Sequence, residues 1–230
     1  MTTTRILTGD DGMTMDVMTN PHAPTWLFEQ RLAKYTGAPF VACVNSCTMA
    51  ITLALAWFIW GRHGHAGAHT IEKSARIPVS MPRPGYLSVP QSVIHAGGWP
   101  TFRDENWTGC YQLQPYPVWD SARRFTSGMY VDGQHQCVSF HASKNLGLEQ
   151  GGAILHDDPA AQAWYERARF DGRTPGVSPR DDTFNFVGFH CYMNPSTAAQ
   201  GMLRLWSFGA HHANLPNDDY PDLSTLQIYK

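Results

Sequence analysis

Residues 137–147 read Cys-Val-Ser-Phe-His-Ala-Ser-Lys-Asn-Leu-Gly, and residues 151–155 read Gly-Gly-Ala-Ile-Leu. Two apolar runs flank a polar loop with one lysine, which predicts a strand, a tight loop and a returning strand. Lysine is scarce, since the chain has only Lys34, Lys73, Lys144 and Lys230. A lysine in a dry pocket loses its proton more easily and can form a Schiff base. Taken alone, the stretch favours an ordinary surface-loop lysine.

Composition limits the classes of protein to which the chain can belong. Its 230 residues are 43% hydrophobic and 16% charged, which indicates a globular chain with a substantial core. The net charge of −2, with no basic stripe, argues against nucleic-acid binding. The five cysteines lie mostly in apolar runs, which is typical of free thiols in a reducing, cytoplasmic compartment. We expect neither a signal peptide nor a membrane-spanning segment from these residues.

Cysteine and histidine spacing gives no support for a metal site. Cys43 and Cys47 have no second pair at ligand spacing. His63, His65 and His69 lie in a glycine-rich stretch without a cysteine or carboxylate partner at useful spacing. A flexible loop is the simpler interpretation, so we expect no metal.

Strand-like and helix-like patterns alternate along the chain. Strands are expected at residues 40–44, 77–81, 99–104, 116–120, 137–140 and 153–155. Helices are expected at residues 25–36, 49–60, 86–96, 159–169 and 195–206. This alternation supports a three-layer α/β/α sandwich around a mostly parallel sheet.

Two polar features follow expected strands. The turn Asn45-Ser46-Cys47-Thr48 leads into a helix, and the free N–H groups of a helix N-terminus can bind an anion. Many such turns only cap their helix, so this signal is weak alone. Asp120 ends another strand, at the sheet edge where open α/β sheets bind ligands.

The turn, Asp120, Ser139 and the lysine loop together resemble the DegT/DnrJ/EryC1/StrS aminotransferases. The family's lysine loop reads Ser-Phe-His-x-x-Lys-Asn, then an acidic residue and Gly-Gly, close to residues 139–152 here. These are fold-type I enzymes dependent on pyridoxal phosphate (PLP), best known for aminating keto sugars attached to nucleotides. The resemblance covers residues 24–206 and implies a PLP-dependent transferase large domain.

Five positions depart from the family pattern. Gln150 directly precedes the glycines, and Cys47 replaces the glycine of the phosphate turn. Trp119 replaces the glutamate before Asp120. Arg123 stands where His or Gln meets the ring oxygen, and Tyr192 stands where Asn or Arg is usual. At Arg123 the ring-oxygen contact would therefore differ from the family's.

The resemblance implies a role for each matching residue. Lys144 would form the Schiff base and shuttle protons, and Asp120 would keep the ring nitrogen protonated. Tyr86 would stack on the ring. Further cofactor-binding residues would be Ser46, Cys47, Thr48, Gln91, Ala122, Arg123 and Ser139. Tyr192 would reach the partner subunit's site, which implies a homodimer.

The resemblance also implies an organisation and an activity. An N-terminal arm (1–24) would precede a PLP-binding large domain (25–206) and a C-terminal tail (207–230), without the family's C-terminal small domain. The enzyme would use PLP and PMP to transfer an amino group from an amino acid, as the small-molecule amino donor, to a nucleotide-linked keto sugar or similar keto acceptor. Two alternatives stay open: PLP-dependent elimination or decarboxylation, and a non-catalytic shortened relative acting as a binding or assembly module.

Overall fold

A five-stranded sheet with the order β3-β9-β8-β7-β6 forms the centre of the computed structural model, which describes residues 6–8, 14–16, 20–71, 76–217 and 219–230. Its strands are β3 (Phe40–Val44), β9 (Gly152–His156), β8 (His135–Ser139), β7 (Val118–Asp120) and β6 (Tyr111–Gln112). The strands β4 (Pro78–Pro82) and β5 (Trp99–Arg103) form a parallel pair, and β1 (Ile6–Thr8) pairs antiparallel with β2 (Thr14–Asp16). The remainder of residues 1–19, most of the expected arm, lies outside the described residues.

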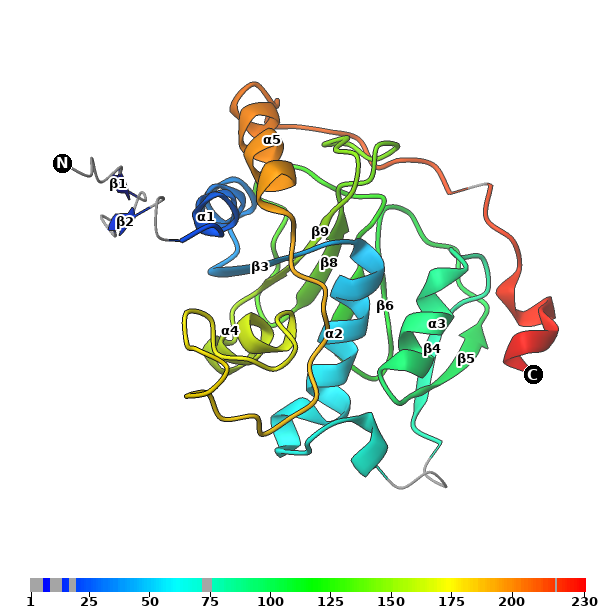
Figure 1. The fold of residues 1–230 in the computed structure, drawn as a ribbon. Coiled ribbons are helices and arrows are strands. Elements are labelled where there is room, and N and C mark those ends of the chain that lie inside the picture. Colours follow the sequence, from blue (N-terminus) through cyan, green and yellow to red (C-terminus); the bar gives the residue numbers. More distant parts are fainter. Residues whose placement is uncertain (1–5, 9–13, 17–19, 72–75, 218) are drawn as a thin grey trace.

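Helices cover both faces of this sheet, which confirms the three-layer sandwich (Figure 1). They are α1 (Ala23–Thr36), α2 (Cys47–Ile59), α3 (Ser88–His95), α4 (Pro159–Ala168) and α5 (Pro195–Trp206). Alternate strand side chains point to opposite faces, as the pleat requires. Ala42, Cys137 and Ile154 join the core formed with α2, α3 and α4. Val41, Val138 and Leu155 join the core formed with α1 and α5.

The expectation of a mostly parallel sheet was wrong. In the five-stranded sheet only β7 and β8 are parallel, whereas β3/β9, β8/β9 and β6/β7 are antiparallel. The connection between β8 and β9, residues 140–151, contains no helix. A strand that returns without a crossover helix pairs antiparallel with the strand it left. The β4/β5 pair keeps the parallel arrangement because α3 connects its two strands.

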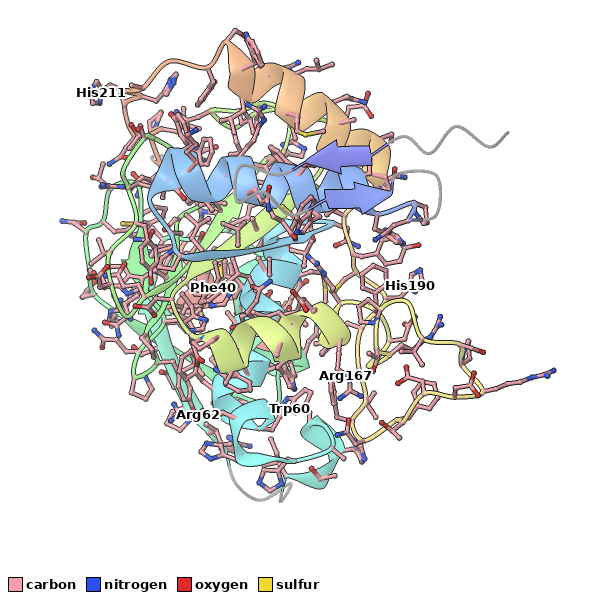
Figure 2. The ribbon with its side chains drawn as sticks, turned by 90° about the vertical axis from the view of Figure 1, so that its left-hand side faces the viewer. Phe40, Trp60, Arg62, Arg167, His190 and His211 are labelled. Atoms are coloured by element: carbon pink, nitrogen blue, oxygen red, sulfur yellow. The ribbon has the colours of Figure 1, made fainter. Side chains whose placement is uncertain are left out.

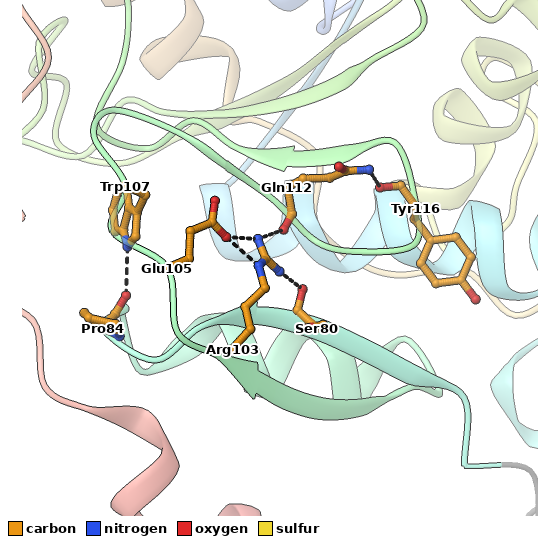
Figure 3. Close-up of polar contacts among 7 residues, drawn as sticks. All are labelled: Ser80, Pro84, Arg103, Glu105, Trp107, Gln112 and Tyr116. Atoms are coloured by element: carbon orange, nitrogen blue, oxygen red, sulfur yellow. Dashed lines mark hydrogen bonds and ion pairs between the residues drawn. The ribbon is translucent and has the colours of Figure 1, made fainter.

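Arg103 attaches the smaller sheet to the edge of the larger one (Figure 3). Its guanidinium donates to the carbonyl oxygens of Ser80 on β4, at 2.5 Å, and Gln112 on β6, at 2.8 Å, and it pairs with Glu105. The backbones of Ser80 and Gln114 exchange two hydrogen bonds of 2.8 and 3.0 Å beside it. The two sheets therefore form one continuous layer.

The chain after α5 packs back onto the sandwich, where the sequence predicted only a tail. We call residues 214–217 and 219–230 the C-terminal strap; it runs past α3 and β5 (red in Figure 1). Leu223 and Tyr229 of the strap are 1% and 7% exposed. The Leu223 amide donates to the Arg83 carbonyl at 2.9 Å, and the Tyr229 hydroxyl donates to the Leu87 carbonyl at 3.0 Å. Buried apolar anchors of this kind fix a segment in place.

Two stacked histidines lie buried between the sheet and α4. The rings of His135 and His156 are 5.1 Å apart, and His135 Nδ1 lies 2.8 Å from the Tyr165 hydroxyl. Burial, and then the neighbouring His156, lowers the pKa of His135 to about 3. Burial also lowers the pKa of His156. Both rings are therefore neutral in the folded protein at neutral pH.

This pair predicts a loss of stability in mild acid. The unfolded chain takes up protons below the ordinary histidine pKa of 6.5, whereas folded His135 does so only near 3. The free energy of unfolding should therefore fall as pH drops below 6.5, by up to about 1.4 kcal/mol per pH unit for each histidine. Urea unfolding of wild type and His135→Gln between pH 7 and 4.5 measures this slope. We expect a shallower slope for His135→Gln and an unchanged one for a His63→Gln control, because His63 is exposed. Equal slopes for all three proteins would contradict the assignment.

Candidate active site

A cavity of about 290 Å³ lies where strands β3, β7 and β8 end and β9 begins. The carboxyl ends of strands are where open α/β sheets bind ligands. Most of the predicted site residues line this cavity: Ser46, Cys47, Thr48, Tyr86, Asp120, Ala122, Arg123, Ser139 and Lys144. Segments 46–48, 120–123 and 139–144, far apart in sequence, are thus brought together.

The N-terminus of α2 forms one wall of the cavity. Ser46 is the N-cap, and its hydroxyl accepts a hydrogen bond of 3.2 Å from the Met49 amide. The Thr48 hydroxyl lies 2.8 Å from the hydroxyl of Ser88, a cavity residue that sequence reasoning missed. Cys47 is the first residue of α2, so it needs no glycine there, and its thiol donates to the Cys137 carbonyl at 3.5 Å. Amides and hydroxyls at a helix N-terminus suit an anion.

Asp120 is a buried carboxylate at the end of β7, 6% exposed. It accepts hydrogen bonds from the Tyr111 hydroxyl at 2.8 Å and from the Ala122 amide at 2.9 Å. Burial raises the pKa of Asp120, although both hydrogen bonds and nearby Lys144 oppose the shift. Burying a carboxylate costs stability unless a positive group compensates it, so its place facing the cavity suggests a cationic ligand.

Lys144 lies half-buried in the loop between β8 and β9. Apolar side chains anchor this loop, since Phe140, Leu146 and Leu148 are at most 2% exposed. The Leu148 amide closes the loop by donating to the Phe140 carbonyl at 2.8 Å. Burial, followed by the charge of Arg123, lowers the pKa of Lys144, while Asp120 acts in the opposite direction. The amine is therefore easier to deprotonate than an ordinary lysine, as a nucleophile requires.

Arg123 connects the cavity to the C-terminal strap. Its Nε donates to the Tyr220 hydroxyl and its Nη2 to the Asp219 carboxylate, both at 2.8 Å. The guanidinium also lies over the Tyr220 ring, 4.4 Å from its centroid. Asp219 and Tyr220 both line the cavity. Sequence reasoning missed these two residues because no local pattern in the strap marks them.

Gln91 does not line the cavity, contrary to its predicted place. Val89, Ser92 and Val93 are at most 2% exposed and form the inner face of α3. Helical periodicity then turns Gln91 outward, where it is exposed. Ser88, three residues earlier, takes the position at the cavity wall.

Tyr192 lies at a second cavity, of about 520 Å³, on the other side of β3 from the first. Its ring stacks on Phe170 at 4.5 Å, and His22 packs edge-on against both rings. We call residues 170–192 the outer segment. It includes His190 (labelled in Figure 2), whose Nδ1 lies 2.9 Å from the Asp171 carboxylate. The predicted contact of Tyr192 with a partner subunit thus concerns an outward-facing part of the chain.

The first cavity combines three chemical capacities. A helix N-terminus can hold an anionic group, a buried carboxylate can hold a protonated nitrogen, and a lysine with a lowered pKa can attack a carbonyl.

Among the residues that the structure describes, no three histidine, cysteine or acidic side chains are grouped as metal ligands. Over the same residues, no helix is long and apolar enough to cross a membrane.

Solved structures share this fold at low sequence identity. AtS13 from Actinomadura melliaura superposes with a TM-score of 0.67 and 18% identity over 80% of this chain and 60% of its own. The sugar aminotransferase CalS13 from Micromonospora echinospora superposes with a TM-score of 0.65 and 14% identity, over 81% of this chain and 61% of its own. NtdA from Bacillus subtilis, solved with bound cofactor PMP, superposes with a TM-score of 0.60 and 19% identity, over 79% of this chain and 47% of its own. The chain therefore spans less than two thirds of each of these structures.

A family model matches most of the chain. It covers residues 13–114 and 128–213, and so includes the α2 turn and the lysine loop. No protein in the curated comparison matches the chain. The sequence match and the shared fold agree with each other: the chain belongs to the DegT/DnrJ/EryC1/StrS aminotransferase family.

Proposed function

We propose that this chain is a PLP-dependent aminotransferase. One observation carries the proposal: Lys144, Asp120 and the N-terminus of α2 all face a single cavity. This set fits PLP, whose phosphate, ring nitrogen and aldehyde need an anion site, a carboxylate and an amine. Ser46, Thr48 and Ser139 would hold the phosphate, Tyr86 would flank the ring, and Asp120 would pair with the ring nitrogen.

The residues of the chain then have distinct tasks in the reaction. When bound, PLP would supply a ring that withdraws electrons from the substrate carbon next to nitrogen. Lys144 would hold the aldehyde through its side-chain amine. Once free, it would take the proton from the substrate carbon as general base and, as general acid, deliver it to the carbon on the other side of the nitrogen. The lowered pKa of Lys144 keeps more of the amine in the unprotonated form that accepts a proton. Asp120 would stabilise a positive charge on the ring nitrogen of the bound cofactor.

Incubation of the purified protein with PLP tests the proposal. Wild type should develop a visible absorption band that Lys144→Ala lacks, while a Lys34→Ala control, on exposed α1 surface, keeps it. Lys144→Ala should still fold, because Lys144 is only half-buried; its circular dichroism spectrum checks this. A folded wild-type protein without a Lys144-dependent band would refute the enzyme proposal and favour a non-catalytic binding module.

The acceptor is proposed to be a nucleotide-linked keto sugar, supported by family membership. Protein loaded with PMP should lose the absorption spectrum of the PMP form when such a sugar is added. A response to simple keto acids alone would contradict this acceptor class, and loss of carbon dioxide or elimination products would indicate another PLP reaction.

We propose that the protein is a cytoplasmic homodimer. The outer segment at residues 170–192 exposes Phe184 and Val187, which are 57% and 59% exposed, and such apolar surface favours association. All five cysteines are free thiols, which supports a reducing compartment. Light scattering should give twice the chain mass of 25.7 kDa. A mass that stays at one chain would refute the dimer.

A further inference from the structure

The C-terminal strap closes one side of the active-site cavity. Anchors hold it before and after the cavity residues Asp219 and Tyr220: the Leu215 amide donates to the Arg123 carbonyl at 2.9 Å, and Leu223 is buried. The Asn217 amide group donates to the Trp107 carbonyl at 2.9 Å, and the Tyr220 ring stacks on Trp107 at 6.0 Å. The strap therefore brings Asp219 to the cavity wall as part of the folded structure.

The two partners of the Arg123–Asp219 ion pair differ in burial. The Arg123 side chain is 13% exposed, whereas that of Asp219 is 70% exposed. The Asp219 carboxylate is already largely in water, so it can leave the arginine at small cost. The guanidinium is mostly buried and needs an acceptor in place. The Tyr220 hydroxyl keeps Nε occupied and fixes the direction of Nη2.

Arg123 shares its cavity with the reactive amine. Both side chains line the first cavity, and the charge of Arg123 contributes to the lowered pKa of Lys144. An amino acid carries its carboxylate on the same carbon as its amine, so a donor whose amine lies near Lys144 presents its carboxylate within a few ångströms. A planar guanidinium is the side chain best suited to bind a carboxylate.

We propose that Arg123 binds the carboxylate group of the amino donor, and that Asp219 occupies this position until the donor arrives. The inference rests on the proposed aminotransferase function and gives the carboxylate of the expected amino acid donor its binding residue. The strap would then contribute to donor specificity. A donor must displace Asp219 from Arg123, and only an anionic group can form a new ion pair with the arginine. Neutral amines gain nothing at Arg123.

Titration with glutarate, a dicarboxylate that has no amine and cannot react, tests the inference by calorimetry. The protein is the full chain loaded with PLP. Arg123→Gln should weaken glutarate binding about tenfold or more. Asp219→Asn should strengthen glutarate binding about threefold, because an uncharged side chain at position 219 competes less well for Arg123. Neutral glutaramide should bind all variants equally weakly.

Two matched variants control for net charge. Arg124→Gln and Asp181→Asn make the same charge changes at residues that do not line the cavity, and both should bind glutarate as wild type does. Glutarate binding that survives Arg123→Gln, or that weakens in Asp219→Asn, would overturn the inference. The Lys144-dependent band is recorded before each titration. Its absence refutes the proposed function, whereas a loaded protein that binds glutarate independently of Arg123 refutes only this inference.

Discussion

Replacing Glu29 with leucine is expected to lower the free energy of unfolding by about 3–5 kcal/mol, because it leaves a buried arginine without its counter-ion. Glu29 and Arg169 are each 8% exposed and form an ion pair between α1 and the end of α4. Glu29 also accepts a hydrogen bond of 2.7 Å from the Cys43 amide, and Arg169 donates one of 2.8 Å to the Cys43 carbonyl. The pair thus connects two helices to the backbone of β3.

Urea unfolding of Glu29→Leu, Arg169→Met and the double variant measures this effect. The double variant should be more stable than either single variant, because it removes both charges together. Asp104→Leu provides the control: its ion pair with Arg83 is 3.4 Å long and exposed, so its loss should cost less than about 1 kcal/mol. A Glu29→Leu protein as stable as the Asp104→Leu protein would contradict the prediction.

Replacing Asp120 with asparagine should cost about 2–5 kcal/mol of PLP binding, a loss of about 30-fold or more in affinity. The carboxylate is the negative group that pairs with the ring nitrogen in the proposed function. Asparagine keeps the shape and can still accept from the Ala122 amide, but it carries no charge. Titration of the visible band with PLP gives the dissociation constant.

Stability separates this role from a structural one. Burial raises the pKa of Asp120, so its charge is a cost to the folded protein, and Asp120→Asn should melt at the same or a higher temperature. Tyr111→Phe, which removes only the 2.8 Å hydrogen bond to Asp120, should weaken PLP binding by about 0.5–1.5 kcal/mol. Asp120→Asn protein that binds PLP as tightly as wild type would refute the assignment.

Short-range patterns predicted the elements of the fold well. The strand at 40–44 and the helix at 195–206 have the predicted bounds, because each has a strong apolar pattern and a clear start. The first helix begins at Ala23, two residues before the predicted Thr25, with no side-chain cap. The two-residue strand β6 was not predicted, since a pattern that short carries no periodicity.

Strand direction and long-range partners could not be predicted in the same way. Alternating strands and helices suggested crossovers, but the helix-free return of residues 140–151 fixed the sheet direction. The turn at 46–48, Asp120 and Lys144 were predicted to share a site because of the resemblance to the aminotransferase family, and the strand ends bring all three to one cavity. Tyr220 lies 97 residues from Arg123, and no local signal indicates that contact.

The closeness of β9 to the first turn of α2 has a consequence for mutational libraries. A Cβ atom on Gly152 would lie 2.5 Å from the Cys47 backbone nitrogen and 2.6 Å from the Ser46 carbonyl carbon. Every amino acid except glycine has a Cβ atom, and here it would clash with backbone atoms, which cannot move aside as a side chain can. If position 152 is fully randomised and folded variants are selected, glycine should be recovered almost alone. Ala153 and Leu155 face the apolar core and should accept other apolar residues.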